Sequence, residues 1–339
     1  MAVSGSSINQ SANQTGNQSG NQSGNQTGTG SGAQVLRIGT RGSPLALAQA
    51  EMVRALLIAA HPALAAGTVE IVPIKTTGDK VQDRTLSEIG GKGLFTKEIE
   101  EALIDGRVDL AVHSMKDVPT WLPPGLIIAA LLQREDPRDV LISPVASSIA
   151  ALPQGAVVGT ASLRRQAQLL GLRPDLKVQP LRGNVGTRLD KLARGEAAAT
   201  FLALAGLKRL GRAEVVTAIL STEEMLPAVA QGAIGIEVRE DDARVRPLVE
   251  ALDHDPTAIA VTAERACLEE LEGSCRTPIA AYAEIAGTEL RLRGLIALPD
   301  GTRSHRAELK GDVGRADAAA LGRAVGRRLK ALAGPGFLA

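Results

Sequence analysis

The sequence predicts an α/β protein, with two α/β domains followed by a smaller α+β domain. Short apolar runs alternate with helical segments between residues 35 and 210, which is typical of parallel sheets covered by helices. After residue 255 the pattern changes to one long helix followed by alternating runs, which indicates an antiparallel unit. A chain of 339 residues is long enough for two or three domains at roughly 100–200 residues each.

The composition argues against several classes of partner. The formal net charge is +1, so no global field attracts nucleic acid or an anionic membrane. Aromatic residues make up 1% of the chain, too few for a base-stacking platform. Two cysteines and four scattered histidines predict no metal site. Without a membrane-length apolar run or a secretion signal, we expect no membrane span and a cytoplasmic location.

Residues 1–33 differ from the rest of the chain. From Asn9 onward the unit Asn-Gln-Ser/Thr-Gly/Ala repeats five times with almost no apolar side chains. Such a tract buries too little surface to offset the entropy of ordering, so it is predicted to be a disordered tail.

The ordered elements are expected to begin at Val35. Ser43 is a suitable N-cap and Pro44 a suitable first residue for the first helix. Strands are expected at 35–39, 69–75, 108–113, 125–132, 138–142, 156–159, 177–180 and 198–204. Further helices are expected at 95–105, 163–170 and 207–210, and in a segment ending near 194. Residues 76–94 are polar and rich in glycine, and they predict a long functional loop.

The last third of the chain has its own pattern. Asp255 and Pro256 start a helix whose apolar stripe includes Cys267, and Gly273 ends it. Alternating runs at 279–285 and 289–297 predict an antiparallel hairpin, with a closing helix at 318–332.

Four strand ends deliver cations or hydroxyl groups into loops. The residues are Arg41 and Ser43; Ser114, Lys116 and Asp117; Thr160, Ser162, Arg164 and Arg165; and Arg182 and Arg188. Three of these loops open into helices, whose N-termini favour anions, and ligands of α/β sheets bind at the carboxyl ends of strands. The pattern favours a cleft for a ligand with several carboxylates or phosphates. The alternative is that the serines are ordinary caps and the arginines are solvated.

Three residues stand out for their chemistry. Asp117 is the one carboxylate among these loops, and it is either a turn former or a group that stabilises a developing cation. Cys275 lies in a turn with Gly, Ser and Arg, where a thiol tends toward reactivity, whereas Cys267 is expected to be buried. The loop around Lys92 lacks the spacing of a nucleotide-binding motif and is interpreted as a lid.

Several segments occur together in a recognisable order. They are 41–46, 90–95, 113–119, 134–139, 162–166, 181–188, 205–210, 231–233 and 271–275. With them the chain resembles the porphobilinogen deaminase (hydroxymethylbilane synthase) family from Val35 to about Leu332. Ala161 and Ser274 depart from the family pattern, in which Ser and Gly are common at these positions.

The resemblance implies a transferase of tetrapyrrole (heme) biosynthesis. Family members join four porphobilinogen units head to tail, with loss of ammonia, and release linear hydroxymethylbilane by hydrolysis. The chain grows on a dipyrromethane primer held by a thioether, which the resemblance places on Cys275. It also implies a monomer whose partner is the small molecule porphobilinogen, with no nucleic acid and no membrane.

The resemblance assigns roles residue by residue. It places catalysis on Asp117. The cofactor-binding residues are Cys275, Asp117, Lys116, Ser114, Thr160, Ser162, Arg164, Arg165, Arg182 and Gly183. The substrate-binding residues are Arg41, Ser43, Arg182, Arg188, Arg209 and Gln231, and the lid residues are Lys92 and Phe95.

The resemblance also implies how the domains divide. Residues 34–133 with 231–250 form domain 1, which includes the loop 76–94, and residues 134–230 form domain 2. Both are expected to be doubly wound α/β domains like those of periplasmic binding proteins. Residues 251–339 form the α+β domain.

A second function of another class is a binding module for a small polycarboxylate, built like a periplasmic binding protein. Such a module needs no reactive thiol, so Cys275 argues against it, as does the missing export signal. An acidic aldehyde reagent that colours pyrroles distinguishes the two functions, because only the transferase carries a primer.

Overall fold

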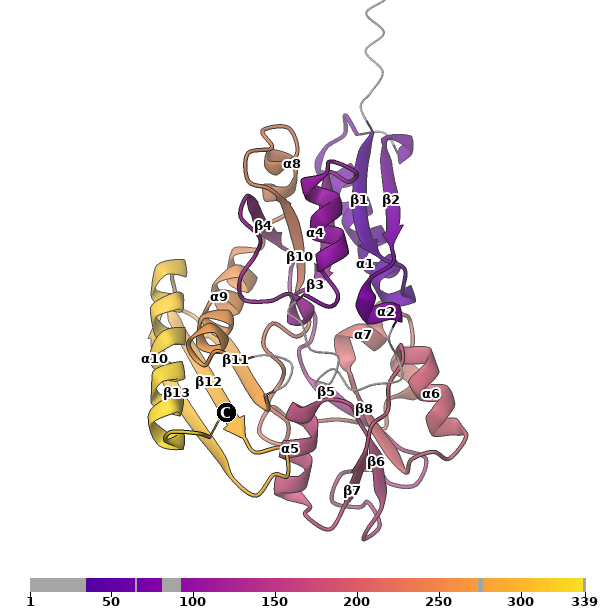
Figure 1. Cartoon of the computed structure of the whole chain (residues 1–339), viewed down its shortest axis with the longest axis vertical. Coiled ribbons are helices and arrows are strands. Elements are labelled where there is room, and N and C mark those ends of the chain that lie inside the picture. The colour runs from indigo at the N-terminus through magenta and orange to yellow at the C-terminus, as the bar shows by residue number, and fades with distance from the viewer. Residues whose placement is uncertain (1–34, 65, 81–92, 274–276, 338–339) are drawn as a thin grey trace, which may run out of the picture. The chain divides into compact units, whose positions relative to one another are not determined.

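The computed structural model describes residues 35–64, 66–80, 93–273 and 277–337. Two five-stranded sheets and one three-stranded sheet organise these residues (Figure 1). The predicted α/β class is therefore confirmed. The predicted tail 1–33, Lys92 and Cys275 lie outside the described residues. In the described ranges, no helix is long and apolar enough to cross a membrane.

The first sheet has the strand order β2-β1-β3-β10-β4. Its strands are β1 (Leu36–Arg41), β2 (Val69–Ile74), β3 (Leu110–Ser114), β4 (Leu126–Leu131) and β10 (Ile234–Arg239). The helices of this part are α1 (Pro44–Ala60), α2 (Thr77–Lys80), α4 (Lys97–Ile104) and α8 (Arg246–Glu250), with short 3-10 turns η1 (Ala66–Thr68) and η2 (Met115–Asp117). Apolar clusters cover both faces of the sheet.

The second sheet has the order β7-β6-β8-β5-β9. Its strands are β5 (Asp139–Ile142), β6 (Val157–Gly159), β7 (Lys177–Gln179), β8 (Ala199–Ala203) and β9 (Ala218–Ile219). Its helices are α5 (Leu163–Leu172), α6 (Val185–Ala193) and α7 (Leu204–Arg209), with the 3-10 turn η3 (Ala213–Val215). Two further apolar clusters form its core.

The predicted parallel pairing is found in part of each sheet, and each sheet also contains antiparallel pairs. In the first sheet β10 runs antiparallel to β3 and β4, and in the second β5 runs antiparallel to β8 and β9. Both strands enter their sheet from a segment that crosses between the two sheets, not through a helix that returns the chain to the same edge. Strand alternation in the sequence does not reveal such a crossing. The predicted domain limits stay a prediction.

The third sheet is antiparallel in the order β11-β12-β13. It consists of β11 (Ile279–Ala286), β12 (Glu289–Ala297) and β13 (Ser304–Asp312), with α9 (Asp255–Glu270) and α10 (Arg315–Ala333) packed together on it. The predicted hairpin and both helices are confirmed. The sequence analysis missed β13, because its inward positions hold few large apolar side chains.

Helix starts follow the predicted chemistry. The Ser43 hydroxyl accepts a hydrogen bond from the backbone N–H of Ala46, with Pro44 at the first position of α1. Ser162 caps α5 in the same way. The segment 76–94, predicted to be one long loop, contains the short helix α2, and its residues 81–92 lie outside the described residues.

The buried carboxylate of Glu264 ties the third sheet to both crossing segments. It accepts hydrogen bonds from Arg134 at 2.6 and 3.0 Å, from the Ala230 backbone N–H at 2.6 Å and from the Ala283 backbone N–H at 2.9 Å. Arg134 follows β4, Ala230 precedes β10, and Ala283 lies in β11. One fully buried side chain on α9 thus satisfies donors from three separate parts of the chain.

Glu264→Ala should lower the free energy of unfolding by about 3–5 kcal/mol, because it leaves the largely buried Arg134 unpaired and two backbone N–H groups unsatisfied. Urea unfolding measures the change. Arg291→Gln, which breaks an exposed pair with Glu308, is the control and should cost about 0–1 kcal/mol. A Glu264→Ala loss no larger than the control's would show that this carboxylate does not hold the segments together.

Candidate active site

A cavity of about 650 Å³ lies at the carboxyl ends of strands from the first and second sheets. Residues just after β1 and β3 form one wall, and residues of α5, α6 and α7 form the other. The N-terminus of α1 and that of α6, capped by the Asn184 side chain, border the space. The cavity therefore has the position that ligands take in α/β proteins, and two helix ends that favour anions.

The walls carry a large excess of positive charge. Among the described residues that line the cavity, seven are cationic: Arg41, Lys75, Lys116, Arg165, Arg182, Arg188 and Arg209. Two are carboxylates, Asp79 and Asp117. A ligand with several anionic groups would balance this charge.

Arg41 has a carboxylate partner inside the cavity. It forms an ion pair with Asp79 and lies 4.1 Å above the centre of the Phe95 ring. Burial alone would raise the pKa of Asp79, but Arg41 outweighs that effect and lowers it. Asp79 is a second carboxylate of the cavity, and it lies outside the four loops in which Asp117 was predicted to be the one carboxylate. The sequence analysis missed it because it lies in the polar segment 76–94, whose contact with β1 is tertiary.

Arg182, Arg188 and Arg209 lack a carboxylate partner within 4 Å in the described part of the chain. Arg188 donates to the Gly183 carbonyl at 2.9 Å, and Arg209 donates to the Gly232 carbonyl at 2.6 Å. The Nη1 atom of Arg182 is buried without a hydrogen-bond partner among the described residues. Burial lowers the pKa of both Arg188 and Arg209 to about 10, so both stay charged at neutral pH.

Lys116 and Asp117 reach the cavity because Met115 anchors the turn η2. The Met115 side chain is buried, and Gly235 on β10 leaves room for it: a Cβ at that glycine would lie 2.1 Å from the Met115 sulfur. Arg41 lies 3.8 Å from the Asp117 carboxylate. Burial lowers the pKa of Lys116 to about 8, an effect that Asp117 opposes and Arg165 reinforces.

Asp139 lies behind the cavity wall, where it pairs with Arg165. This fully buried carboxylate lies 2.7 Å from Arg164 and 2.7 Å from Arg165, and accepts a hydrogen bond from Gln231 at 2.9 Å. Burial would raise its pKa, but the two guanidinium groups outweigh burial and lower it. Arg164 also donates to the Leu226 carbonyl at 2.7 Å.

The structure brings most of the predicted site residues together. Those lining the cavity are Arg41, Ser43, Phe95, Ser114, Lys116, Asp117, Arg165, Arg182, Gly183, Arg188 and Arg209. Thr160, Ser162, Arg164 and Gln231 are not among the lining residues. Lys92 and Cys275 lie outside the described residues. Lys75, Asn184 and Thr187 also line the cavity. Asn184 and Thr187 lie in the segment 181–188 that carries the resemblance but were assigned no role, and nothing in the local sequence distinguishes Lys75 from a surface residue.

The prediction that Cys267 is buried is confirmed, whereas Cys275 lies outside the described residues. Cys267 is fully buried on α9, and burial raises the pKa of its thiol to about 12. It therefore holds its proton at neutral pH and is a poor nucleophile. The chain then leaves α9 through Glu272, in the left-handed region with φ 55°, and Gly273, where a Cβ would lie 2.3 Å from the Ile279 side chain.

Carboxylate binding in this cavity should weaken as the pH rises. Lys116 attracts an anion only when protonated, and its pKa near 8 means that this charge is lost between pH 7 and 9. We expect the Kd for a dicarboxylate such as glutarate to rise by up to about fivefold between pH 8 and 9. Calorimetric titration measures it.

Lys116→Arg is the matched variant for that titration, because a guanidinium stays charged over the whole range. It should remove most of the dependence on pH. The same dependence in the variant would assign the titration to another group.

Residues 36–247 match the family model described as "Porphobilinogen deaminase, dipyromethane cofactor binding domain". Residues 258–331 match "Porphobilinogen deaminase, C-terminal domain".

Curated relatives agree with the family models. The chain is 56% identical over 305 residues to "Porphobilinogen deaminase, chloroplastic" of Oryza sativa, covering 89% of this chain and 85% of that protein. It is 56% identical over 302 residues to "Porphobilinogen deaminase" of Paracoccus denitrificans, covering 89% of this chain and 96% of that protein.

Solved structures with a similar backbone include periplasmic binding proteins. A periplasmic substrate-binding protein from Coxiella burnetii has 17% identity and a TM-score of 0.40, covering 68% of this chain and 97% of that one. A periplasmic domain of BvgS from Bordetella pertussis has 15% identity and a TM-score of 0.39, covering 64% and 86%. With TM-scores below 0.5, these likenesses add nothing to the family assignment.

Proposed function

This chain belongs to the porphobilinogen deaminase family, and we propose that its cavity assembles four porphobilinogen units into linear hydroxymethylbilane. The units are joined head to tail with loss of ammonia, and hydrolysis releases the product. We further propose that it acts as a monomer in the cytoplasm, where thiols stay reduced.

The observation that carries this proposal is the set of cavity cations without carboxylate partners. Each porphobilinogen unit has an acetate and a propionate, so a growing chain adds two carboxylates per coupling. Arg182, Arg188 and Arg209 each keep guanidinium N–H groups that no described carboxylate uses. Arginine pairs with carboxylates in bidentate geometry, which suits this substrate better than a single point charge would.

The same residues fit the dipyrromethane cofactor named by the family model. The buried, unpartnered Nη1 of Arg182 and the partly buried Lys116 are donors that its carboxylates would satisfy. When bound, the cofactor supplies the pyrrole end to which the first substrate unit is joined. Arg165, held in place by Asp139, would orient a carboxylate at the adjoining wall.

Asp117 is the residue that we propose for catalysis. Arginine and lysine donate hydrogen bonds but accept none, so a pyrrole N–H needs a carboxylate or carbonyl acceptor. The other lining carboxylate, Asp79, is already engaged by Arg41 and Thr76. Asp117, one-third exposed to the cavity, would accept the pyrrole N–H and stabilise the positive charge that develops as ammonia leaves.

Cys275 is the residue that we propose as the thioether anchor. The resemblance places it in the matching Leu271–Cys275 segment, and the chemistry of the second cysteine supports the choice. Cys267 is enclosed by the core of the third sheet, and its high pKa disfavours the thiolate that the linkage needs. A covalent anchor would keep each intermediate bound, so that every coupling is effectively intramolecular.

Asp117→Asn should reduce turnover by at least about 100-fold, because it keeps the side-chain shape and removes the charge that stabilises the transition state. Asp117→Glu should retain more activity than Asn. Steady-state rates with melting curves decide the point. Near-normal turnover in Asp117→Asn would show that this residue only forms a turn and that another group is catalytic.

The intact mass of the purified protein should exceed the polypeptide mass by two linked pyrrole units. Cys275→Ser should lose that added mass, the colour with an acidic aldehyde reagent, and activity, whereas Cys267→Ala should keep all three. Added mass that persists in Cys275→Ser would place the anchor on another residue.

A further inference from the structure

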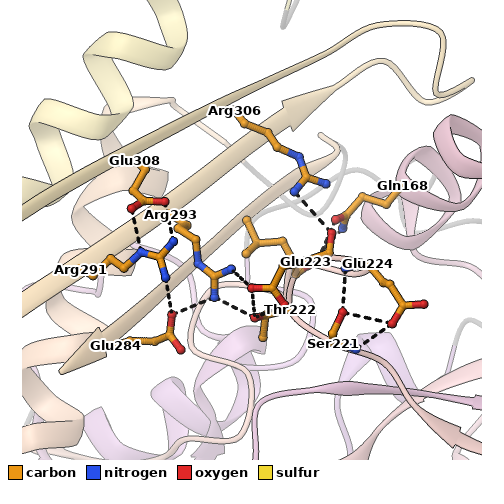
Figure 2. Close-up of polar contacts among 11 residues, drawn as sticks. Gln168, Ser221, Thr222, Glu223, Glu224, Glu284, Arg291, Arg293, Arg306 and Glu308 are labelled. Carbon is orange, nitrogen blue, oxygen red and sulfur yellow. Dashed lines mark hydrogen bonds and ion pairs between the residues drawn. The ribbon is translucent and has the colours of Figure 1, made fainter. Parts of the chain in front are cut away.

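A polar contact joins the third sheet to the segment 221–226, which leads from β9 toward β10 (Figure 2). This segment is a capped turn. The Ser221 hydroxyl accepts from the Glu224 backbone N–H at 3.2 Å, and the Glu224 carboxylate accepts from the Ser221 backbone N–H at 3.1 Å. The two bonds form a capping box, which holds the intervening Thr222 and Glu223 toward the sheet.

Arg293 on β12 makes the main contact with that turn. It lies 2.8 Å from the Glu223 carboxylate, and donates to the Thr222 hydroxyl at 2.8 Å and to Glu284 on β11 at 2.8 Å. Its side chain is only 12% exposed and lies beside the Tyr282 ring at 5.5 Å. Arg293 is therefore a mostly buried cation shared between the third sheet and the turn. We call the Arg293–Glu223–Thr222 contact the latch.

The other end of the turn is bound to the second sheet. The Leu226 backbone N–H donates to the Gln168 side chain at 2.8 Å, and the Gln168 amide donates back to the Leu226 carbonyl at 3.1 Å. Arg164 donates to the same carbonyl at 2.7 Å and pairs with Asp139, which also pairs with Arg165 in the cavity wall. The backbone of the turn therefore connects the contacts of β12 with the polar contacts behind the cavity wall.

This inference rests on the proposed function, in which the latch has a role in placing the growing chain. The residue proposed as anchor precedes β11 by a few positions, and β11 pairs with β12 along its whole length. A substrate chain that lengthens on a fixed anchor must have its free end placed in the cavity anew at each coupling. The position of the third sheet relative to the second therefore sets where the reacting end lies.

We propose that Arg293 and Glu223 are positioning residues for chain elongation. They fix the position of the third sheet relative to the cavity wall formed by α5, α6 and α7. They touch neither substrate nor reacting atoms. Their effect is on the placement of the anchored chain end, and free porphobilinogen, which meets only the cavity residues, is bound independently of them. Misplacement of reacting groups by a change far from the chemistry can cost about 100-fold in rate.

Glu223→Gln and Arg293→Gln should each lower kcat by about tenfold or more while leaving KM for porphobilinogen within about twofold. The added mass of two pyrrole units should be retained, and enzyme carrying one to three further units should accumulate in intact mass spectra. Because Glu223 is largely exposed, the melting temperature of its variant should change by no more than about 2–4 °C. Arg293→Lys, which keeps the charge, should recover part of kcat.

The matched control is the neighbouring pair Arg291–Glu308, with the same residue types at 2.7 Å and with Arg291 on the same strand. It stays within the third sheet and does not reach the turn (Figure 2). Arg291→Gln and Glu308→Gln should keep wild-type kcat and KM.

Three results would overturn this proposal. They are latch variants that match the controls, a rise in KM at unchanged kcat, or a loss of kcat that follows the melting temperature across all five variants. A wild-type protein that forms no hydroxymethylbilane would instead overturn the proposed function, and the mass spectrum of the wild type separates the two failures.

Discussion

The buried charge of Asp139 is the constraint on which the candidate site depends. Two guanidinium groups on consecutive residues of α5 would repel each other in a dry interior, and Asp139 pairs with both and offsets one of their two charges. The same carboxylate accepts from Gln231, in the segment that crosses back to the first sheet. One charge therefore places Arg165 in the cavity wall and fastens the crossing segment beneath it. Arg164 pairs with the same charge and reaches the Leu226 carbonyl, so it serves the structure around the site.

In the cavity itself, most of the positive charge has no carboxylate partner among the described residues. Arg182, Arg188 and Arg209 are held by backbone carbonyls or by packing, and their mutual repulsion is a cost in stability that a ligand would relieve. Glu264 and Arg134 show the opposite arrangement, in which a buried charge of the framework has its partner. The contrast between paired charges in the framework and unpaired charges in the cavity is the strongest physical sign that this cavity binds a polyanion.

Local chemistry made much of this structure predictable, and tertiary contacts account for what was missed. The caps at Ser43 and Ser162 and the cations at strand ends follow from short-range rules, so most elements and eleven cavity residues were found. The pairing of Arg41 with Asp79 and of Arg164 with Asp139 joins residues 38 and 25 positions apart, which periodicity does not reveal. The strand β13 was missed because its pairing with β12, and not an alternating pattern of apolar side chains, defines it as a strand.

The place of β10 in the first sheet has a consequence for biosynthesis. Residues 234–239 lie between β3 and β4, whereas all five strands of the second sheet fall within residues 139–219. The chain leaves the ribosome from its N-terminus, so the second sheet is the first whose strands have all been synthesised. Until β10 has been synthesised, β4 has no strand to pair with. The N-terminal half thus completes its fold after the part that follows it, and the exposed edges of β3 and β4 are the surfaces that need protection in the interval.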